Sequence, residues 1–167
     1  MAIGLLILRL FVGLTLAVHG AQKLFGWFGG YGLAGTGGFL EQLGFFPGKR
    51  HALFAGLAEL SGGALLALGL ATPLAATLII SVMFVAIATI HLKHGFFNQN
   101  QGYEYNLTLA LVALSFAIIG AGPISVDAAL RLQDAGPVWG LAALLAGVIG
   151  GAVELAGRKV PAAQNVS

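Results

Sequence analysis

Hydrophobic positions along the chain gather into long blocks that Gly, Pro and a few polar residues separate. Five apolar runs cover most of the sequence: Ala2 to about Leu24, His51 to Leu70, Leu74 to about Leu92, Tyr103 to Gly122 and Val138 to about Ala156. Each has about the 20 residues that an α-helix needs to cross a bilayer. The pattern predicts an all-α membrane protein, a bundle of four transmembrane helices with a fifth C-terminal span.

The segments between the runs predict how the spans are joined. Gly69 to Pro73 reads as a tight turn, because Gly favours a helix end and Pro a helix start. After the fourth run we expect a short surface helix from Ser125 to Leu132, capped by Ser125 or Asp127. The chain then divides into a four-helix membrane domain (1–130), a linker with the additional span (131–157) and a polar cytoplasmic tail (158–167).

Composition supports a bilayer as the solvent of this chain. Hydrophobic residues make up 58% of it and charged residues 8%, with a mean hydropathy of +0.93, whereas soluble domains carry roughly 25% charged residues. A soluble enzyme, a disordered tail and a nucleic-acid binder are excluded on this ground. The first run holds Arg9, follows no charged leader and lacks a small-residue cleavage pattern, so we expect a retained span and not a signal peptide.

The absence of cysteine narrows the chemistry. It excludes disulfides, thiol redox chemistry, cysteine-ligated iron–sulfur clusters and a covalently attached c-type haem. Any redox role therefore needs a dissociable cofactor.

The few cations predict the orientation of the spans. With five spans, Arg9 and Arg131 fall on one side, and the opposite side collects Lys23, Lys49, Arg50, Lys93, Arg158 and Lys159. By the positive-inside rule the second side is cytoplasmic, which puts the N-terminus outside and the C-terminus inside. Scattered in this way, the cations form no stripe that nucleic acid would bind.

Ionisable residues inside the spans are the strongest candidates for chemistry. Glu59 lies about eight residues into its span, about 12 Å deep, where a carboxylate must be protonated, paired or facing water. His19 lies at a similar depth, so a contact with Glu59 is reasonable, and Lys23 follows His19 by four on the same helix face. These side chains either form a functional polar patch or only join the helices by buried hydrogen bonds. Arg9, about 15 Å farther along, is expected to anchor the outer side or to pair with a group there.

A second group of polar residues gathers before the fourth run. Glu104 at the start of this run is stabilised by the helix dipole, and the polar residues near it in the sequence make it a further candidate for the polar core. The candidate cofactor-binding residues are His91, Tyr103, Asn106 and, from the first loop, Trp27. His91 and His94 are spaced for a shared metal, but no third ligand is placed, so no metal site is predicted. Gly30, Gly32 and Gly35 match a dinucleotide-binding pattern without the strand that it requires.

Small residues in the last run repeat every four positions. The two rows are Ala143, Gly147 and Gly151, and Ala142, Ala146 and Gly150. Such rows let two helices approach closely. We therefore expect this span to pack against a helix, with a homo-oligomer as one use of the rows.

Several separated motifs resemble the DoxX family of small bacterial and archaeal membrane proteins. They are RLFVGLTLAVHGAQKLFGWFGGYGLAGTGGFLEQLGF, GLAELSGGALLALGLATPLAA, HLKHGFFNQNQGYEYN and GPISVDAAL, and they extend from about Leu8 to Leu130. The chain departs from the pattern at Asn106, where relatives often have Pro. The resemblance carries His19, Lys23, Glu59 and Glu104 over as a candidate polar core.

The resemblance also implies a class of function. The family takes its name from a subunit of a thiosulfate:quinone oxidoreductase, and relatives are linked to membrane redox systems. We therefore expect a membrane redox accessory that binds a quinone, with soluble or membrane redox subunits as partners. Two alternatives stay open: a non-enzymatic scaffold that recruits soluble redox enzymes through the cytoplasmic loops, and a small proton-coupled transporter.

Overall fold

The computed structural model describes residues 1–132 and 134–159, and this part of the chain contains helices and no strands. The predicted all-α fold is confirmed. Most of the predicted polar tail, from residue 160 on, lies outside the described residues.

Four of the helices are long and apolar enough to cross a membrane: α1, α3, α4 with the turns that continue it to His94, and α7. A fifth apolar helix, α5, has 16 residues and ends three residues before the predicted end of its run. The elements are α1 (Ala2–Phe25), η1 (Trp27–Gly29), α2 (Gly32–Gln42), α3 (Gly48–Leu68), α4 (Thr72–Ala86), η2 (Ile87–His91), η3 (Leu92–His94), η4 (Asn98–Asn100), α5 (Glu104–Ile119), α6 (Val126–Ala129) and α7 (Pro137–Ala156).

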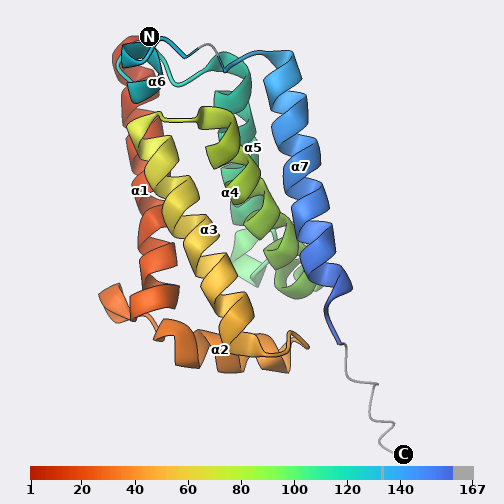
Figure 1. Ribbon diagram of the computed structural model, residues 1–167. Helices are drawn as coiled ribbons and strands as arrows, with labels where there is room; N and C mark the ends of the chain where they lie inside the picture. Colours follow the sequence, from red (N-terminus) through yellow and green to blue (C-terminus); the bar gives the residue numbers. More distant parts are fainter. Residues whose placement is uncertain (133, 160–167) are drawn as a thin grey trace, which may run out of the picture.

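The long helices pack side by side, and the short ones lie at the two ends of the bundle (Figure 1). α1 packs mainly on α3, whereas α4 packs on α3, α5 and α7. α2, in the segment between α1 and α3, packs on both helices at one end of the bundle. α6 lies at the other end, near the N-terminus.

Glycines bring α1 and α3 together along their length. A Cβ on Gly13 would lie 2.6 Å from the carbonyl oxygen of Gly63, and a Cβ on Gly20 would lie 2.6 Å from that of Gly56. Any larger residue would force the backbones apart, since these neighbours are main-chain atoms. We call these contacts the α1–α3 glycine seam. It fixes which residues of the two helices face each other.

One of the two small-residue rows of α7 packs within the chain. Ala143, Gly147 and Gly151 are buried, and a Cβ on Gly147 would lie 2.8 Å from Cβ of Ile80 on α4. The other row, Ala142, Ala146 and Gly150, is exposed. The exposed row is therefore the one through which two copies of α7 could pack, and such a homo-oligomer stays a hypothesis.

Asp127 joins the short helix α6 to the start of α4. Ser125 caps α6, accepting from the amide of Ala128 at 3.1 Å. Asp127, the alternative predicted cap, is 8% exposed and accepts from Thr72 Oγ1 at 2.7 Å and from the amides of Ala71 and Thr72 at 2.8 and 3.3 Å. This carboxylate therefore satisfies amides at the start of α4, which lies 55 residues earlier in the chain.

Arg9 is buried at the same end of the bundle, where it binds a loop. The prediction that it pairs with a group on that side therefore holds, and the prediction of an exposed anchor is wrong. The residue is 2% exposed, and its Nη2 donates to the carbonyl of Ile124. A buried guanidinium can hold a loop only where carbonyl groups face it. The turn at Gly69 leaves room for it, since a Cβ there would collide with the Arg9 guanidinium.

Replacing Asp127 by Ala should destabilise the fold. The substitution removes the acceptor of two amides and one hydroxyl, and each buried donor left unpaired costs about 1–3 kcal/mol. Thermal unfolding in detergent should show a lower midpoint for Asp127→Ala and a smaller loss for Asp127→Asn, which keeps one acceptor oxygen. Equal midpoints for wild type and Asp127→Ala would contradict this assignment of the cap.

Candidate functional site

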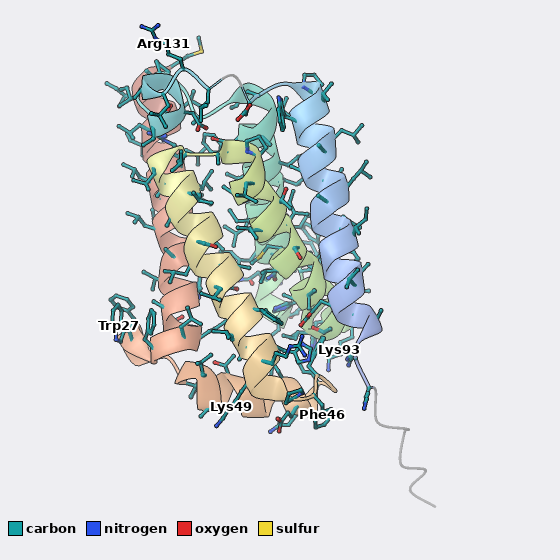
Figure 2. All side chains as sticks on the ribbon, in the orientation of Figure 1. Trp27, Phe46, Lys49, Lys93 and Arg131 are labelled. Carbon is teal, nitrogen blue, oxygen red and sulfur yellow. The ribbon has the colours of Figure 1, made fainter. Side chains whose placement is uncertain are left out.

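A cavity of about 590 Å³ lies inside the bundle, lined by parts of α1 to α5 and of α7. Its wall is mostly apolar, with Leu16, Phe39, Phe54, Val82 and Leu109 among the lining residues. Its polar lining residues are His19, Lys23, Thr36, His51, Glu59, Ser81, Thr89, His91, Asn98, Tyr105, Asn106 and Glu154. The cavity lies toward the end of the bundle that carries Lys49 and Lys93 (Figure 2).

The position of the cavity follows from how α3 and α4 pack. Near the turn that joins them the two helices are in contact, since a Cβ on Gly62 would lie 3.1 Å from Cβ of Leu78. Farther from the turn, α3 contributes its cavity-lining residues up to Glu59 and α4 contributes its own from Ser81 on. The space between the two helices therefore begins one turn beyond their last close contact.

A buried ion pair lies in the wall of this cavity. Lys23 Nζ of α1 lies 2.5 Å from Glu59 Oε2 of α3, with 30% and 6% of the two side chains exposed. A carboxylate this deep in an apolar bundle is stable only when a cation or donor compensates it. The α1–α3 glycine seam places these two residues opposite each other.

His19 lines the same cavity but is not the hydrogen-bond partner of Glu59. Its Nδ1 lies 3.1 Å from Oε1 of Gln22, one turn along α1, and the Gln22 amide donates to the carbonyl of Phe28. The proposed contact with Glu59 is thus replaced by the pair with Lys23. Lys23, one turn from His19 on the same helix face, is therefore the partner of Glu59.

A second polar contact, which the sequence did not suggest, spans the cavity wall between α3 and α7. His51 Nδ1 lies 2.5 Å from Glu154 Oε1. The His51 ring packs on Phe45 with centroids 5.3 Å apart, and the Arg158 guanidinium lies 5.9 Å from the same phenyl ring. An acidic residue inside the last apolar run was the available signal for Glu154. Its partner lies 103 residues away, beyond what spacing can predict.

Two of the candidates near the fourth run line the cavity. His91 does so while its Nδ1 lies 2.7 Å from the carbonyl oxygen of Gln101. Asn106 is 8% exposed, and its amide lies 3.5 Å from Sδ of Met83. Both are therefore placed to contact a molecule in the cavity.

Three other candidates do not line it. Glu104 begins α5 and accepts from the amide of Asn98 at 3.0 Å, which is a structural role. Tyr103 packs edge-on against Phe96, and Trp27 is 59% exposed and packs on Phe25. The structure therefore separates these three from His19, Lys23 and Glu59.

Metal ligands are not grouped in the part of the chain that the structure describes. No three His, Asp or Glu side chains of residues 1–132 and 134–159 are arranged to hold an ion. The polar groups of the cavity offer hydrogen bonds and protons.

Comparison with known proteins identifies the family. The DoxX family model matches residues 4–92, more than half of the chain. The chain belongs to the DoxX family. It is also 31% identical over 125 residues to "Putative oxidoreductase CatD" of Bacillus subtilis (strain 168), which covers 75% of this chain and 85% of the relative. No solved structure matches.

Membership and helix composition together make this DoxX protein a multi-pass membrane protein. The matched region contains His19, Lys23, Glu59 and His91. Asn106 and Glu154 of the cavity lie beyond it. The predicted family is confirmed, whereas the roles of these residues stay predictions.

Breaking the Lys23–Glu59 pair from one side should cost more stability than replacing it whole. Lys23→Met leaves a buried carboxylate without its cation, and such single losses cost about 3–5 kcal/mol, whereas apolar replacement of both partners is often nearly neutral. We expect the double variant Lys23→Met/Glu59→Met to unfold at a higher temperature than Lys23→Met. A double-mutant cycle from unfolding in detergent measures the coupling, and additive losses would contradict the pair.

Proposed function

We propose that this DoxX protein binds a quinone in the cavity between its helices and acts as a subunit or accessory of a membrane redox system. The observation that carries the proposal is the ion pair of Lys23 and Glu59 in the wall of a largely apolar cavity of about 590 Å³. Such a site combines an apolar space for a ring and chain with few polar groups that fix its orientation.

The size of the cavity suits this ligand. Pockets for small organic molecules and cofactors span about 300–1,000 Å³. Phe39, Phe54 and Leu109 offer apolar contact to a quinone ring and its first isoprenoid units. Lys23 and His19 are groups that can donate hydrogen bonds to quinone oxygens.

The polar residues also suit the protonation that quinone reduction requires. Two electrons and two protons convert the two carbonyls of a quinone into hydroxyls. Glu59 and His19 are side chains that can deliver protons in a buried site. In this proposal a partner redox subunit supplies the two electrons. The name of the Bacillus relative supports a redox setting.

The charge pattern supports a position for the cavity across the membrane. Lys49 and Lys93 lie at the end where the cavity is found, and Arg131 lies at the opposite end (Figure 2). The positive-inside rule then puts the cavity in the cytoplasmic half of the membrane, with the N-terminus outside. A bacterial cytoplasmic membrane is the membrane that we propose.

Quinone binding to the purified protein tests the proposal. Titration with a short-chain ubiquinone or menaquinone analogue should give saturable binding, and Glu59→Gln and His19→Ala should each weaken it about tenfold, the loss of roughly 1.4 kcal/mol expected for one hydrogen bond to a buried polar group.

Two matched substitutions serve as controls. Glu104→Gln and His94→Ala make the same chemical changes at residues that do not line the cavity, and we expect unchanged affinity. Unchanged affinity in Glu59→Gln and His19→Ala would refute this site for the quinone.

Exposed aromatic residues favour a second candidate, the non-enzymatic scaffold. Phe96 and Phe97 of the loop before α5 are 44% and 60% exposed at the end of the bundle that bears Lys93. Large exposed apolar groups that gather on a loop are one kind of protein contact surface. Such a loop could recruit a soluble redox enzyme.

Recovery of partners from native membranes discriminates the two candidates. For a scaffold, the loop variant Phe96→Ser/Phe97→Ser, which changes no cavity-lining residue, should abolish co-purification of a redox enzyme while quinone affinity stays at wild-type level. Retention of the same partners by the loop variant would remove the scaffold.

A further inference from the structure

A second cavity, of about 650 Å³, lies next to the first, between the end of α1 and helix α2. Three residues line both cavities: Lys23, Thr36 and Phe39. The remaining lining residues of the second cavity are Gln22, Gly29, Gly30, Tyr31, Gly35, Gly38 and Gln42. The two spaces are therefore neighbours on either side of a thin wall.

Helix α2, which lines the second cavity, covers one end of the bundle (Figure 1). Tyr31, Gly38 and Gln42 are exposed, and Tyr31 keeps 84% of its surface. Its lining includes hydroxyl and amide groups and a single ionisable cation, Lys23. The side chains of Gln22, Thr36 and Gln42 offer hydrogen bonds to water that enters this glycine-rich space.

Lys23 is the only charged residue that borders both cavities in the described residues. Its ammonium lies 2.5 Å from Glu59, yet 30% of its side chain is exposed whereas Glu59 keeps 6%. A lysine has a flexible four-carbon stem that lets its head reach water while the stem stays on apolar surface. The ammonium is thus held at Glu59 by a side chain that also lines the second cavity.

We propose that the second cavity is the aqueous entrance through which protons reach Glu59, with Lys23 as the gate between water and the apolar cavity. With Glu59 ionised, the ammonium stays on the carboxylate and closes the wall. A proton that water delivers to the Glu59 carboxylate cancels its charge, and the ammonium turns to Thr36, Gln42 and water. When Glu59 gives that proton to the bound molecule, its charge returns and draws Lys23 back. Only this one proton moves, and no electron is transferred.

This inference rests on the proposed function for its purpose, because a proton on Glu59 is useful only to a ligand that accepts it. Its structural content is independent of the ligand: water should enter the first cavity through the second. That content can be tested without any quinone.

A chain without cysteine allows the test by single-cysteine labelling. Ala58 lines the first cavity alone, so Ala58→Cys reports water there. Gly38 lines the second cavity alone, and a Cβ on it would meet no atom within 4 Å, so Gly38→Trp fills the space without a collision at its base. Ala34→Trp is the matched control, since Ala34 is exposed on the same helix and lines neither cavity.

The measurement is the rate at which Ala58→Cys reacts with a small charged methanethiosulfonate in lipid nanodiscs, where both faces meet solution. Gly38→Trp should slow the reaction roughly tenfold, since the reagent attacks the thiolate, which forms only where water reaches the sulfur. Ala34→Trp should leave the rate unchanged. Gly38→Leu, a smaller plug, should give an intermediate rate, and the thermal unfolding midpoint of each variant confirms that it folds.

An unchanged rate in folded Gly38→Trp would overturn the entrance. So would an equal slowing in Ala34→Trp, which would indicate a general effect of α2. Quinone affinity separates this outcome from a failure of the proposed function. If Glu59→Gln weakens quinone binding but Gly38→Trp leaves the labelling rate unchanged, the entrance alone is refuted. If Gly38→Trp slows the labelling but the protein binds no quinone, quinone as the ligand is refuted and the entrance stands.

Discussion

The close approach of α1 and α3 is the constraint on which the rest of the structure depends. At Gly13, Gly20 and Gly63 the main chains of the two helices come so near that no Cβ fits, and a Cβ on Gly56 would collide with the Leu24 side chain. In a membrane, where no hydrophobic force distinguishes a helix from lipid, such backbone contact supplies much of the packing energy. The same contact determines that Lys23 faces Glu59, and without it the buried carboxylate would lack its cation. The same helix contact therefore provides both the packing of α1 on α3 and the pairing of Lys23 with Glu59.

The cavity follows from a second feature, the limited contact between α3 and α4. These helices touch near their turn, where Gly62 meets Leu78, and farther along they line a common space instead of each other. α7 packs on α4 through Gly147 and reaches α3 through the pair of His51 with Glu154. The contact of His51 with Glu154 thus joins α3 and α7 beside the cavity, whereas the Lys23–Glu59 pair joins the closely packed helices α1 and α3.

The fold was accessible from the sequence because apolar runs of membrane length have few alternatives to a helix. The depth of a residue along its helix could also be predicted, and this prediction placed His19, Lys23 and Glu59 at a similar depth in the membrane. The partner of Glu59 was not, because two residues one turn apart, His19 and Lys23, present the same face and only packing selects between them. His51 with Glu154 was missed because pairing between distant segments depends on how α7 lies against the bundle. Glu104 was misplaced because nearness to polar neighbours in sequence does not bring a side chain into the cavity.

Scarcity of charge has a consequence for how this DoxX protein can work. Lys23, Glu59, His51 and Glu154 each both line the cavity and join two helices, so the groups able to hold a ligand also hold the bundle. A ligand that takes a hydrogen bond from one partner of a pair weakens a contact between helices at the same moment. Binding in the cavity is then coupled to helix packing, since any group with affinity for one partner of the pair competes with the other. A tightly packed four-helix core without such pairs would be more stable, and it would have no means to respond to what enters it.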